Sequence, residues 1–281
     1  MKTINRLQPL LEDGVIDRVM RELMSGKEAT VYVVRCGDDV RCAKVYKEAQ
    51  NRSFHQSVHY TEGRKVKNSR QARAMENGSK YGRKSKEIAW QNAEFEALHR
   101  LADAGVRIPR PYNFYNGVLI MELITDAEGN PAQRLNDVRF TPEEARSHHK
   151  TLLLEVVRML CAGIVHGDLS EFNILLSGDG PVIIDLPQAV DAATNNHASE
   201  MLQRDVSNLS TFFGRFAPEL LNRQYGKEIW SLYKRGNLNT DVILTGEFKQ
   251  CEKEVDLKSV VQLIEEAKAE AERKLRYKVK V

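Results

Sequence analysis

The stretch Ile164–Leu176, IVHGDLSEFNILL, places three polar side chains between two apolar runs. These side chains are His166, Asp168 and Asn173, and a further apolar run, PVIID, then ends at Asp185. The runs NILL and PVIID flank the glycine-containing segment SGDG, so we expect a turn between two short strands. The polar groups are therefore predicted on a loop and at a strand end.

The spacing of these residues is typical of phosphoryl transfer. Asp168 and Asn173 are five residues apart, and Asp185 follows Asn173 by twelve. This chemistry needs a carboxylate near the attacking group and oxygen ligands for Mg²⁺. We predict that Asp168 orients the nucleophile or accepts its proton, and that Asn173 and Asp185 hold metal. His166 is expected to anchor the loop rather than to act as a base. Asp and Asn often cap turns, so capping alone can account for one such residue. It accounts poorly for three residues at the spacing of a catalytic loop.

Composition narrows the class of protein without deciding its function. The 281 residues are 42% hydrophobic, enough for one large domain or two modest ones, and the net charge of +3 does not by itself indicate nucleic acid. The four cysteines form no C-x-x-C pair, which favours reduced thiols. The longest apolar candidate, residues 159–165, is far below the roughly 20 residues that a membrane helix needs. We expect a soluble, cytoplasmic chain with no membrane partner.

Hydrophobic periodicity predicts a strand-rich first part and a mainly helical second part. Helices are expected at 9–24, 87–104, 142–163, 198–214, 216–235 and 255–275, and strands at 30–35, 40–46, 117–124, 173–176 and 181–185. The order predicts an α+β fold with two lobes, namely a β-rich N-lobe with one main helix and a helical C-lobe.

A nucleotide cradle is predicted upstream of the loop. Ser25 and Gly26 form a turn that leads into a strand, where backbone N–H groups can face phosphate oxygens. Lys44 lies within an alternating strand pattern and is the candidate phosphate contact, with Lys47 as the second choice. Such a lysine needs an acidic partner, and Glu94 on the predicted helix is the candidate.

A basic segment separates the predicted strands from the first long helix. Residues 64–86 contain nine Lys or Arg and one acid. We predict a long mobile insert over about 47–86, because structureless connections of this length are usually functional or disordered. A solvated loop is the commoner outcome for a charge run, but this one could also bind RNA phosphates.

Together these stretches resemble the RIO family of atypical protein kinases, closest in pattern to its first subfamily. SGKEATVY is similar to the family's phosphate loop, AKVYK to its lysine strand, WQNAEF to its helix glutamate and LIMELI to its hinge. HGDLSEFNIL is similar to its catalytic loop and IIDLPQAV to its metal-binding segment. The resemblance covers roughly residues 23–216, and the tail beyond about 226 resembles an extension of bacterial members.

The resemblance implies a protein-kinase-like fold and an ATP- and Mg²⁺-dependent serine/threonine protein kinase, with Mn²⁺ as a possible substitute. Domain boundaries follow as an N-terminal helical extension (1–22), N-lobe (23–124), C-lobe (125–225) and C-terminal helical extension (226–281). Asp168 and Asp185 are implied as catalytic, the latter also as an aspartyl-phosphate acceptor in a possible ATPase cycle, and Asn173 and Asp185 as metal ligands. The implied ATP-binding residues are Ser25, Gly26, Lys27, Glu28, Ala29, Val31, Lys44, Glu94, Glu122 and Ile124. Autophosphorylation is expected, and the protein substrate is unknown.

Two other functions stay open at this stage. Aminoglycoside and choline phosphotransferases share the fold and a similar catalytic loop, but Ser170-Glu171 and the SGKEATVY start favour the RIO pattern. An ATP-switched factor that binds RNA or the small ribosomal subunit through residues 64–86 is the second alternative. Gly167 stands where many protein kinases carry Arg, so regulation by a phosphate bound at that position is not expected.

Overall fold

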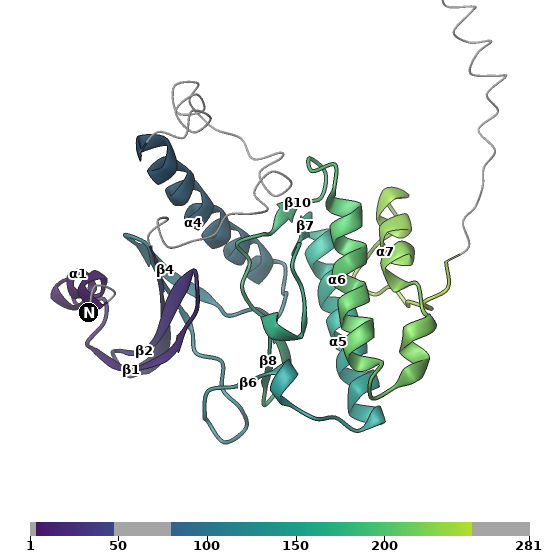
Figure 1. Ribbon diagram of the computed structural model, residues 1–281, viewed down its shortest axis with the longest axis horizontal. Coiled ribbons are helices and arrows are strands. Elements are labelled where there is room, and N and C mark those ends of the chain that lie inside the picture. The colour runs from purple at the N-terminus through teal and green to yellow at the C-terminus, as the bar shows by residue number, and fades with distance from the viewer. Residues whose placement is uncertain (1–3, 48–79, 249–281) are drawn as a thin grey trace, which may run out of the picture. The chain divides into compact units, whose positions relative to one another are not determined.

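The computed structural model of the protein describes residues 4–47 and 80–248 (Figure 1). Its first part is built on a five-stranded antiparallel sheet with the strand order β1-β2-β3-β5-β4. The strands are β1 (Arg18–Ser25), β2 (Ala29–Cys36), β3 (Asp39–Tyr46), β4 (Pro111–Tyr115) and β5 (Val118–Glu122). The predicted insert up to residue 79 and the predicted helix at 255–275 lie outside the described residues.

The predicted helix at 9–24 is wrong for its second half. A 3-10 turn, η1 (Ile4–Arg6), and a short helix, α1 (Gln8–Glu12), come first, and Gly14 then takes a positive φ of 69°. The residues of β1 have good helix propensity, but their backbone groups pair with β2 from Arg18 to Ser25. Tertiary hydrogen bonding has overridden a weak local preference here.

The two faces of the sheet serve different purposes because side chains alternate along each strand. One face, with Tyr32, Val34 and Val45, packs against the buried Leu7 and Leu10 of the N-terminal segment. The other face carries a cross-strand row, in which Met24 pairs with Val31, Val31 with Lys44, and Lys44 with Leu119. Lys44 therefore points away from the buried cluster that includes Leu7 and Leu10.

The helix α4 (Lys80–Asp103) lies between β3 and β4 in the chain and supplies the predicted main helix of this lobe. It begins at Lys80 rather than Glu87, so the last part of the predicted mobile insert is helical. It ends as expected near Gly105, whose φ of 72° requires glycine-like backbone freedom. Along it, Glu94 is buried and Glu96 is exposed, so Glu94 is the acid that faces the sheet.

The second part is mainly helical, as predicted. It contains α5 (Pro142–Cys161), α6 (Ala198–Phe213), the 3-10 helix η5 (Pro218–Asn222) and α7 (Tyr225–Lys234). The single helix predicted at 216–235 is wrong, because Arg223 has extended backbone (φ −104°, ψ 146°) and interrupts it. Short elements carry the loops between α5 and α6: β7 (Ile164–Val165), η4 (Glu171–Asn173), β8 (Ile174–Ser177), β9 (Gly180–Ile183) and β10 (Val190–Asp191). Before α5 lie β6 (Gln133–Arg134) and η3 (Leu135–Asp137).

The larger core runs through both lobes. Tyr46 and Leu119 of the sheet belong to the same buried cluster as Leu153, Leu169 and Phe213 of the second part. A capping box between Thr141 and Glu144 starts α5 at the predicted position. None of the helices in the described ranges is long and apolar enough to cross a membrane.

Candidate active site

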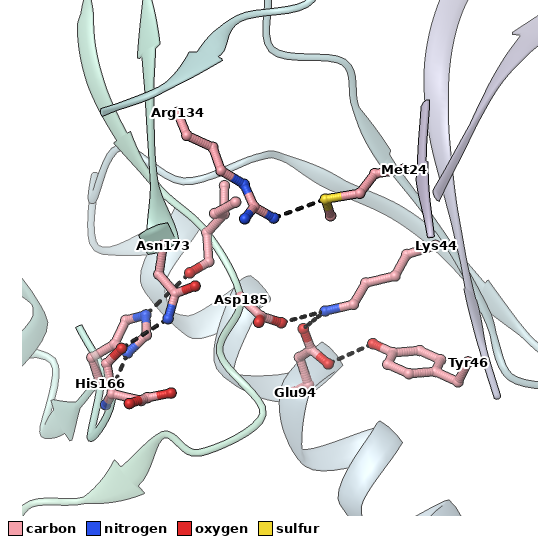
Figure 2. Close-up of polar contacts among 10 residues, drawn as sticks. Met24, Lys44, Tyr46, Glu94, Arg134, His166, Asn173 and Asp185 are labelled. Carbon is pink, nitrogen blue, oxygen red and sulfur yellow. Dashed lines mark hydrogen bonds and ion pairs between the residues drawn. The ribbon is translucent and has the colours of Figure 1, made fainter. Parts of the chain in front are cut away.

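The site is organised around the ammonium group of Lys44. Its Nζ donates to Glu94 Oε1 at 2.7 Å and to Asp185 Oδ1 at 2.7 Å (Figure 2). The three residues come from β3, α4 and the segment after β9, so one cation joins three separate parts of the chain. The predicted pairing of Lys44 with Glu94 is confirmed, whereas its contact with Asp185 was not foreseen.

Tyr46 provides the second hydrogen bond to the Glu94 carboxylate. Its hydroxyl donates to Glu94 Oε2 at 2.6 Å, so each oxygen of this carboxylate has one donor (Figure 2). Tyr46 lies two residues after Lys44 on β3, and the Lys44 ammonium is 5.4 Å from its ring centroid. All three side chains are buried, with Lys44 9%, Glu94 3% and Tyr46 1% exposed. A buried charge without partners costs much free energy, so this arrangement holds all three side chains in place.

Lys44 and Asp185 each shift the pKa of the other in the direction that favours its charged form. Desolvation acts to lower the pKa of Lys44, but the negative charges of Asp185 and Glu94 outweigh it and raise the pKa well above its ordinary value. Desolvation acts to raise the pKa of Asp185, but the charge and hydrogen bond of Lys44 hold it below its ordinary value. These shifts keep Lys44 as an ammonium and Asp185 as a carboxylate at neutral pH.

His166 anchors the loop, as predicted. It is 2% exposed, its Nδ1 accepts from the Asp168 N–H at 3.3 Å, and its Nε2 lies 3.1 Å from the Ile184 carbonyl. Acceptance at Nδ1 assigns the proton to Nε2, which then donates to Ile184. Burial lowers the pKa of His166, so the ring is neutral and holds the loop beside the segment that carries Asp185.

Asn173 and Asp185 are brought to the same place by backbone bonds. Asn173 Nδ2 donates to the Asp168 carbonyl at 2.8 Å, and the Asn173 carbonyl accepts from Ile184 N at 3.0 Å. Asp185 has a φ of 67°, which is uncommon for a residue with a side chain. This strained backbone lies where the carboxylate reaches Lys44, as expected for a residue set by function rather than by local preference.

Asp205 holds the loop around Asp168 through its backbone N–H groups. This α6 residue is 1% exposed, and it accepts from Gly167 N at 2.8 Å and from Leu169 N at 3.0 Å, on either side of Asp168. Gly167 has a φ of 82°, a conformation that side chains disfavour. Asn208 adds a third bond from α6, to the Leu169 carbonyl at 2.9 Å.

Asp168 itself is accessible to solvent. Desolvation by the surrounding protein raises the pKa of its carboxyl, Arg204 acts to lower it, and Asp185 acts to raise it. Arg204 also donates to the carbonyl of Gly167, the residue before Asp168. The carboxylate is therefore the one acid of the loop that faces outward with a raised proton affinity, which suits a group that accepts a proton.

The predicted phosphate loop is a tight turn between β1 and β2. Gly26 N donates to the Ala29 carbonyl at 2.9 Å, and the Lys47 ammonium donates to Ser25 Oγ at 3.0 Å and to the Gly26 carbonyl at 2.6 Å. Lys47 N donates to the Glu28 carbonyl at 2.8 Å. Lys47, which was the second candidate for contacting phosphate, thus stabilises the turn through these hydrogen bonds.

The remaining predicted nucleotide contacts are spread along the sheet. Lys27 is exposed at the tip of the turn, Ala29 is buried, and Val31 is cross-strand to Lys44. At the predicted hinge, Ile124 is 4% exposed. The Glu122 side chain is occupied by Arg107, 3.2 Å from both carboxylate oxygens, and its N–H donates to the Arg110 carbonyl at 2.9 Å. Of this residue's polar groups, the backbone carbonyl is the one left to contact a nucleotide.

The residues present fit a divalent cation only together with substrate. No cluster of three or more His, Cys, Asp or Glu suitable for a metal ion occurs among the described residues. Asn173 and Asp185 supply one amide oxygen and one carboxylate. Mg²⁺ is usually held by one or two carboxylates plus substrate phosphates, and this donor set fits that pattern.

Comparison with known proteins places the chain in a family. A model described as RIO domain matches residues 30–225, which is more than half of the chain. The chain belongs to the RIO family. Its relatives include the RIO-type serine/threonine-protein kinase Rio1 of Haloferax volcanii, 35% identical over 214 residues, with 76% of this chain and 69% of that protein covered.

Other members of the RIO family show the same relationship at lower identity. The RIO-type serine/threonine-protein kinase Rio1 of Methanocaldococcus jannaschii is 31% identical, with 76% of this chain and 69% of that protein covered. The human serine/threonine-protein kinase RIO1 is 31% identical over 73% of this chain, but the match spans only 35% of that longer protein.

A kinase domain of known crystal structure matches with a TM-score of 0.44 at 16% identity, over 73% of this chain and 65% of that chain.

Sequence reasoning missed four residues that shape this RIO site: Tyr46, Arg134, Arg204 and Asp205. Tyr46 could have been found, since it shares a strand face with Lys44 two residues away. Asp205 stands among Met201, Val206 and Leu209 on the apolar side of α6, and an acid in such a position is a signal of a buried role. Arg134 donates to Met24 Sδ at 2.8 Å across the site, a contact that only the tertiary structure reveals (Figure 2).

We expect Tyr46→Phe to loosen Glu94 and, through it, Lys44. Loss of the hydrogen bond leaves Glu94 Oε2 without its buried donor, which costs about 2 kcal/mol of unfolding free energy for a charged acceptor. The KM for ATP should rise several-fold. Urea unfolding and ATP-dependence of turnover measure the two effects, with the exposed Tyr115→Phe as the matched control. Equal behaviour of the two variants would show that Tyr46 contributes only its ring.

We expect the stability of the fold to depend on pH through Asp205. Burial raises the pKa of Asp205 from 3.8 to about 7, against the two N–H donors that act to lower it. The folded chain then binds a proton between about pH 4 and pH 7 that the unfolded chain releases, so this group's contribution to stability should decline as pH rises through that window. Urea unfolding of the wild type and of Asp205→Asn across that range measures the decline. The difference between their free energies of unfolding should become smaller as the pH rises. A difference that is independent of pH would mean that the N–H donors, and not burial, set the pKa.

Proposed function

We propose that this RIO-family chain is a serine/threonine protein kinase that transfers the γ-phosphoryl group of ATP with the help of a divalent cation. The observation that carries the proposal is the contact of Lys44 with both Glu94 and Asp185, next to a loop in which Asp168 faces solvent. Phosphoryl transfer depends mainly on positioning and charge stabilisation, and this arrangement offers both.

Each residue has a proposed role. Lys44, positioned by Glu94 and Tyr46, binds ATP phosphates. Asp168 orients the acceptor hydroxyl and takes its proton, and Asn173 and Asp185 hold the cation, which would neutralise the phosphates. Mg²⁺ suits this oxygen donor set, and Mn²⁺ would be accepted by the same ligands.

The proposed ATP site extends along β1, β2 and the hinge. Its residues are Ser25, Gly26, Lys27, Glu28, Ala29, Val31, the Glu122 backbone and Ile124. The Asp185 carboxylate has a second oxygen beside the one that contacts Lys44. Attack of this carboxylate on the γ-phosphorus forms an aspartyl-phosphate and releases ADP, and water then hydrolyses the acyl phosphate. This would give net ATPase activity beside protein phosphorylation and autophosphorylation.

The alternatives have less support. Membership of a family whose named relatives are protein kinases does not favour a small-molecule phosphotransferase. Contact of residues 64–86 with RNA or the small ribosomal subunit stays a prediction, since only the helical part from Lys80 lies within the described residues. The domain boundaries and a cytoplasmic location likewise stay predictions.

The deciding experiment is incubation of the full chain with γ-labelled ATP, Mg²⁺ and a protein acceptor, followed by acid and hydroxylamine treatment. Label that resists hydroxylamine is phosphoserine or phosphothreonine, and label that is lost is an acyl phosphate on a carboxylate such as Asp185. If the protein and the acceptor carry neither kind of label, the proposed function is wrong.

We expect Asp185→Ala to abolish both phosphate transfer and ATPase activity, because the cation loses its carboxylate ligand and Lys44 loses its partner. Asp168→Asn should lower kcat by about 100-fold or more with little change in ATP affinity, as for loss of a general base. Turnover and nucleotide binding measure these effects, and Asp179→Asn, exposed in the turn between β8 and β9, is the control. Wild-type turnover in Asp185→Ala would show that the metal assignment is wrong.

A further inference from the structure

A cavity of about 390 Å³ lies where α6, the end of η5 and the start of α7 meet. The two helices pack closely there (Figure 1): a Cβ added at Gly226 of α7 would lie 3.0 Å from the Gln203 Cα of α6. Gly226 is therefore what lets α7 approach, and Gln203 and Gly226 both line the cavity. The cavity is apart from the Lys44 site and has no role in the proposed transfer step.

The walls of this cavity are positively charged. Arg204, Arg223 and Lys227 line it, and none of the described residues that line it is Asp or Glu. Arg223 shares its charge with Glu247, whose carboxylate is 3.7 Å away. Lys227 is exposed, and no acid among the described residues lies within ion-pair distance of it. The charge balance at the cavity therefore favours an anion.

A neutral hydroxyl in the lining, that of Ser210, can donate to an anion. Ser210 is 7% exposed, and its hydroxyl is 3.1 Å from Nε2 of His149, which is 2% exposed. Burial lowers the pKa of His149 to about 4, so the ring is neutral at pH 7 and adds no charge of its own. The residue before α7, Gln224, also lines the cavity and makes no side-chain cap, so this residue does not satisfy the first N–H groups of that helix.

Arg204 links the cavity to the catalytic loop. It lines the cavity and also donates to the carbonyl of Gly167, directly before Asp168. An anion in the cavity thus lies one side chain away from the loop that carries the proposed base. Leu221, 53% exposed, adds an apolar patch to the lining. A mixed apolar and cationic lining of side-chain size suits a protein segment better than a nucleic acid backbone.

We propose that this cavity binds an acidic side chain, either a carboxylate or a phosphorylated residue, of the protein whose serine or threonine is phosphorylated at Asp168. The inference rests on the proposed function and adds a substrate class to it, namely proteins with an acidic residue near the acceptor. Lys227 and Arg223 supply the charge, and Ser210 and the start of α7 supply hydrogen bonds. Lys227 is a specificity-determining residue that does not touch the reacting atoms.

The test uses the full chain and peptides with one acceptor serine and one glutamate, the glutamate being moved through the positions on either side. Each peptide is compared with a twin that carries glutamine. At the best position we expect the wild type to show a KM about ten-fold lower for the glutamate peptide, with kcat unchanged, since one well-placed charge pair is worth roughly a factor of ten. Lys227→Gln should remove most of this preference and Lys227→Glu should reverse it.

The control is Lys234→Gln, an exposed lysine at the other end of α7 that does not line the cavity. It should keep the preference, and all variants should phosphorylate the glutamine peptide equally. Equal effects of Lys227→Gln and Lys234→Gln, or a wild type that does not distinguish the peptides, would overturn the proposal.

Binding without ATP separates this inference from the proposed function. Fluorescence anisotropy of the labelled peptides should give the same preference and the same dependence on Lys227. If binding follows this pattern but no peptide is phosphorylated, the cavity assignment holds and the kinase assignment fails. If Lys227→Gln weakens binding of a short single-stranded RNA and leaves the glutamate preference intact, the cavity is a nucleic acid contact and the proposal is wrong.

Discussion

One buried ammonium group is the constraint on which the site depends. Lys44 is removed from water between Glu94 and Asp185, at 2.7 Å from each, and the desolvation of a cation is tolerated only where opposite charges replace the lost hydration. Removal of either carboxylate takes away one of the two acidic acceptors that replace water around this ammonium group. The sheet, α4 and the segment after β9 must therefore meet at one point, and a buried apolar cluster with residues from both lobes holds these parts together.

The loop that carries Asp168 is held by a second set of contacts, almost all to backbone atoms. Asp205 binds the N–H groups of Gly167 and Leu169, and His166 connects Asp168 N with the Ile184 carbonyl. These bonds satisfy the backbone and leave the Asp168 carboxylate free to face solvent. A rigid loop with one free carboxylate is what a positioned proton acceptor needs.

The helix α6 connects the two sites of the second lobe. Asp205 and Asn208 face the catalytic loop, whereas Ser207 and Thr211 line the basic cavity, and Arg204 contacts both. A single helix thus holds the proposed base and forms a wall of the proposed docking site. Such an arrangement lets the position of a bound acidic residue be fixed relative to Asp168 without any moving part.

The sequence by itself determined the chemistry and most of the helices and strands. Asp168 and Asn173 lie five positions apart, so a single loop conformation sets their relation, and the alternation along β3 was enough to direct Lys44 toward Glu94. Periodicity also located α5 and α6, since each buries one regular apolar face. These features are local, and local geometry can be read from spacing.

Only the tertiary structure decided the rest. Residues 18–25 became a strand because β2 offered them a hydrogen-bonding edge, and no pattern within those residues signals that neighbour. The same holds for the contact between Lys44 and Asp185, 141 residues apart, and for the basic cavity, whose lining comes from three elements. Such features arise from the free energy of pairing and burial between distant segments, which is settled when the chain folds and not within any one segment.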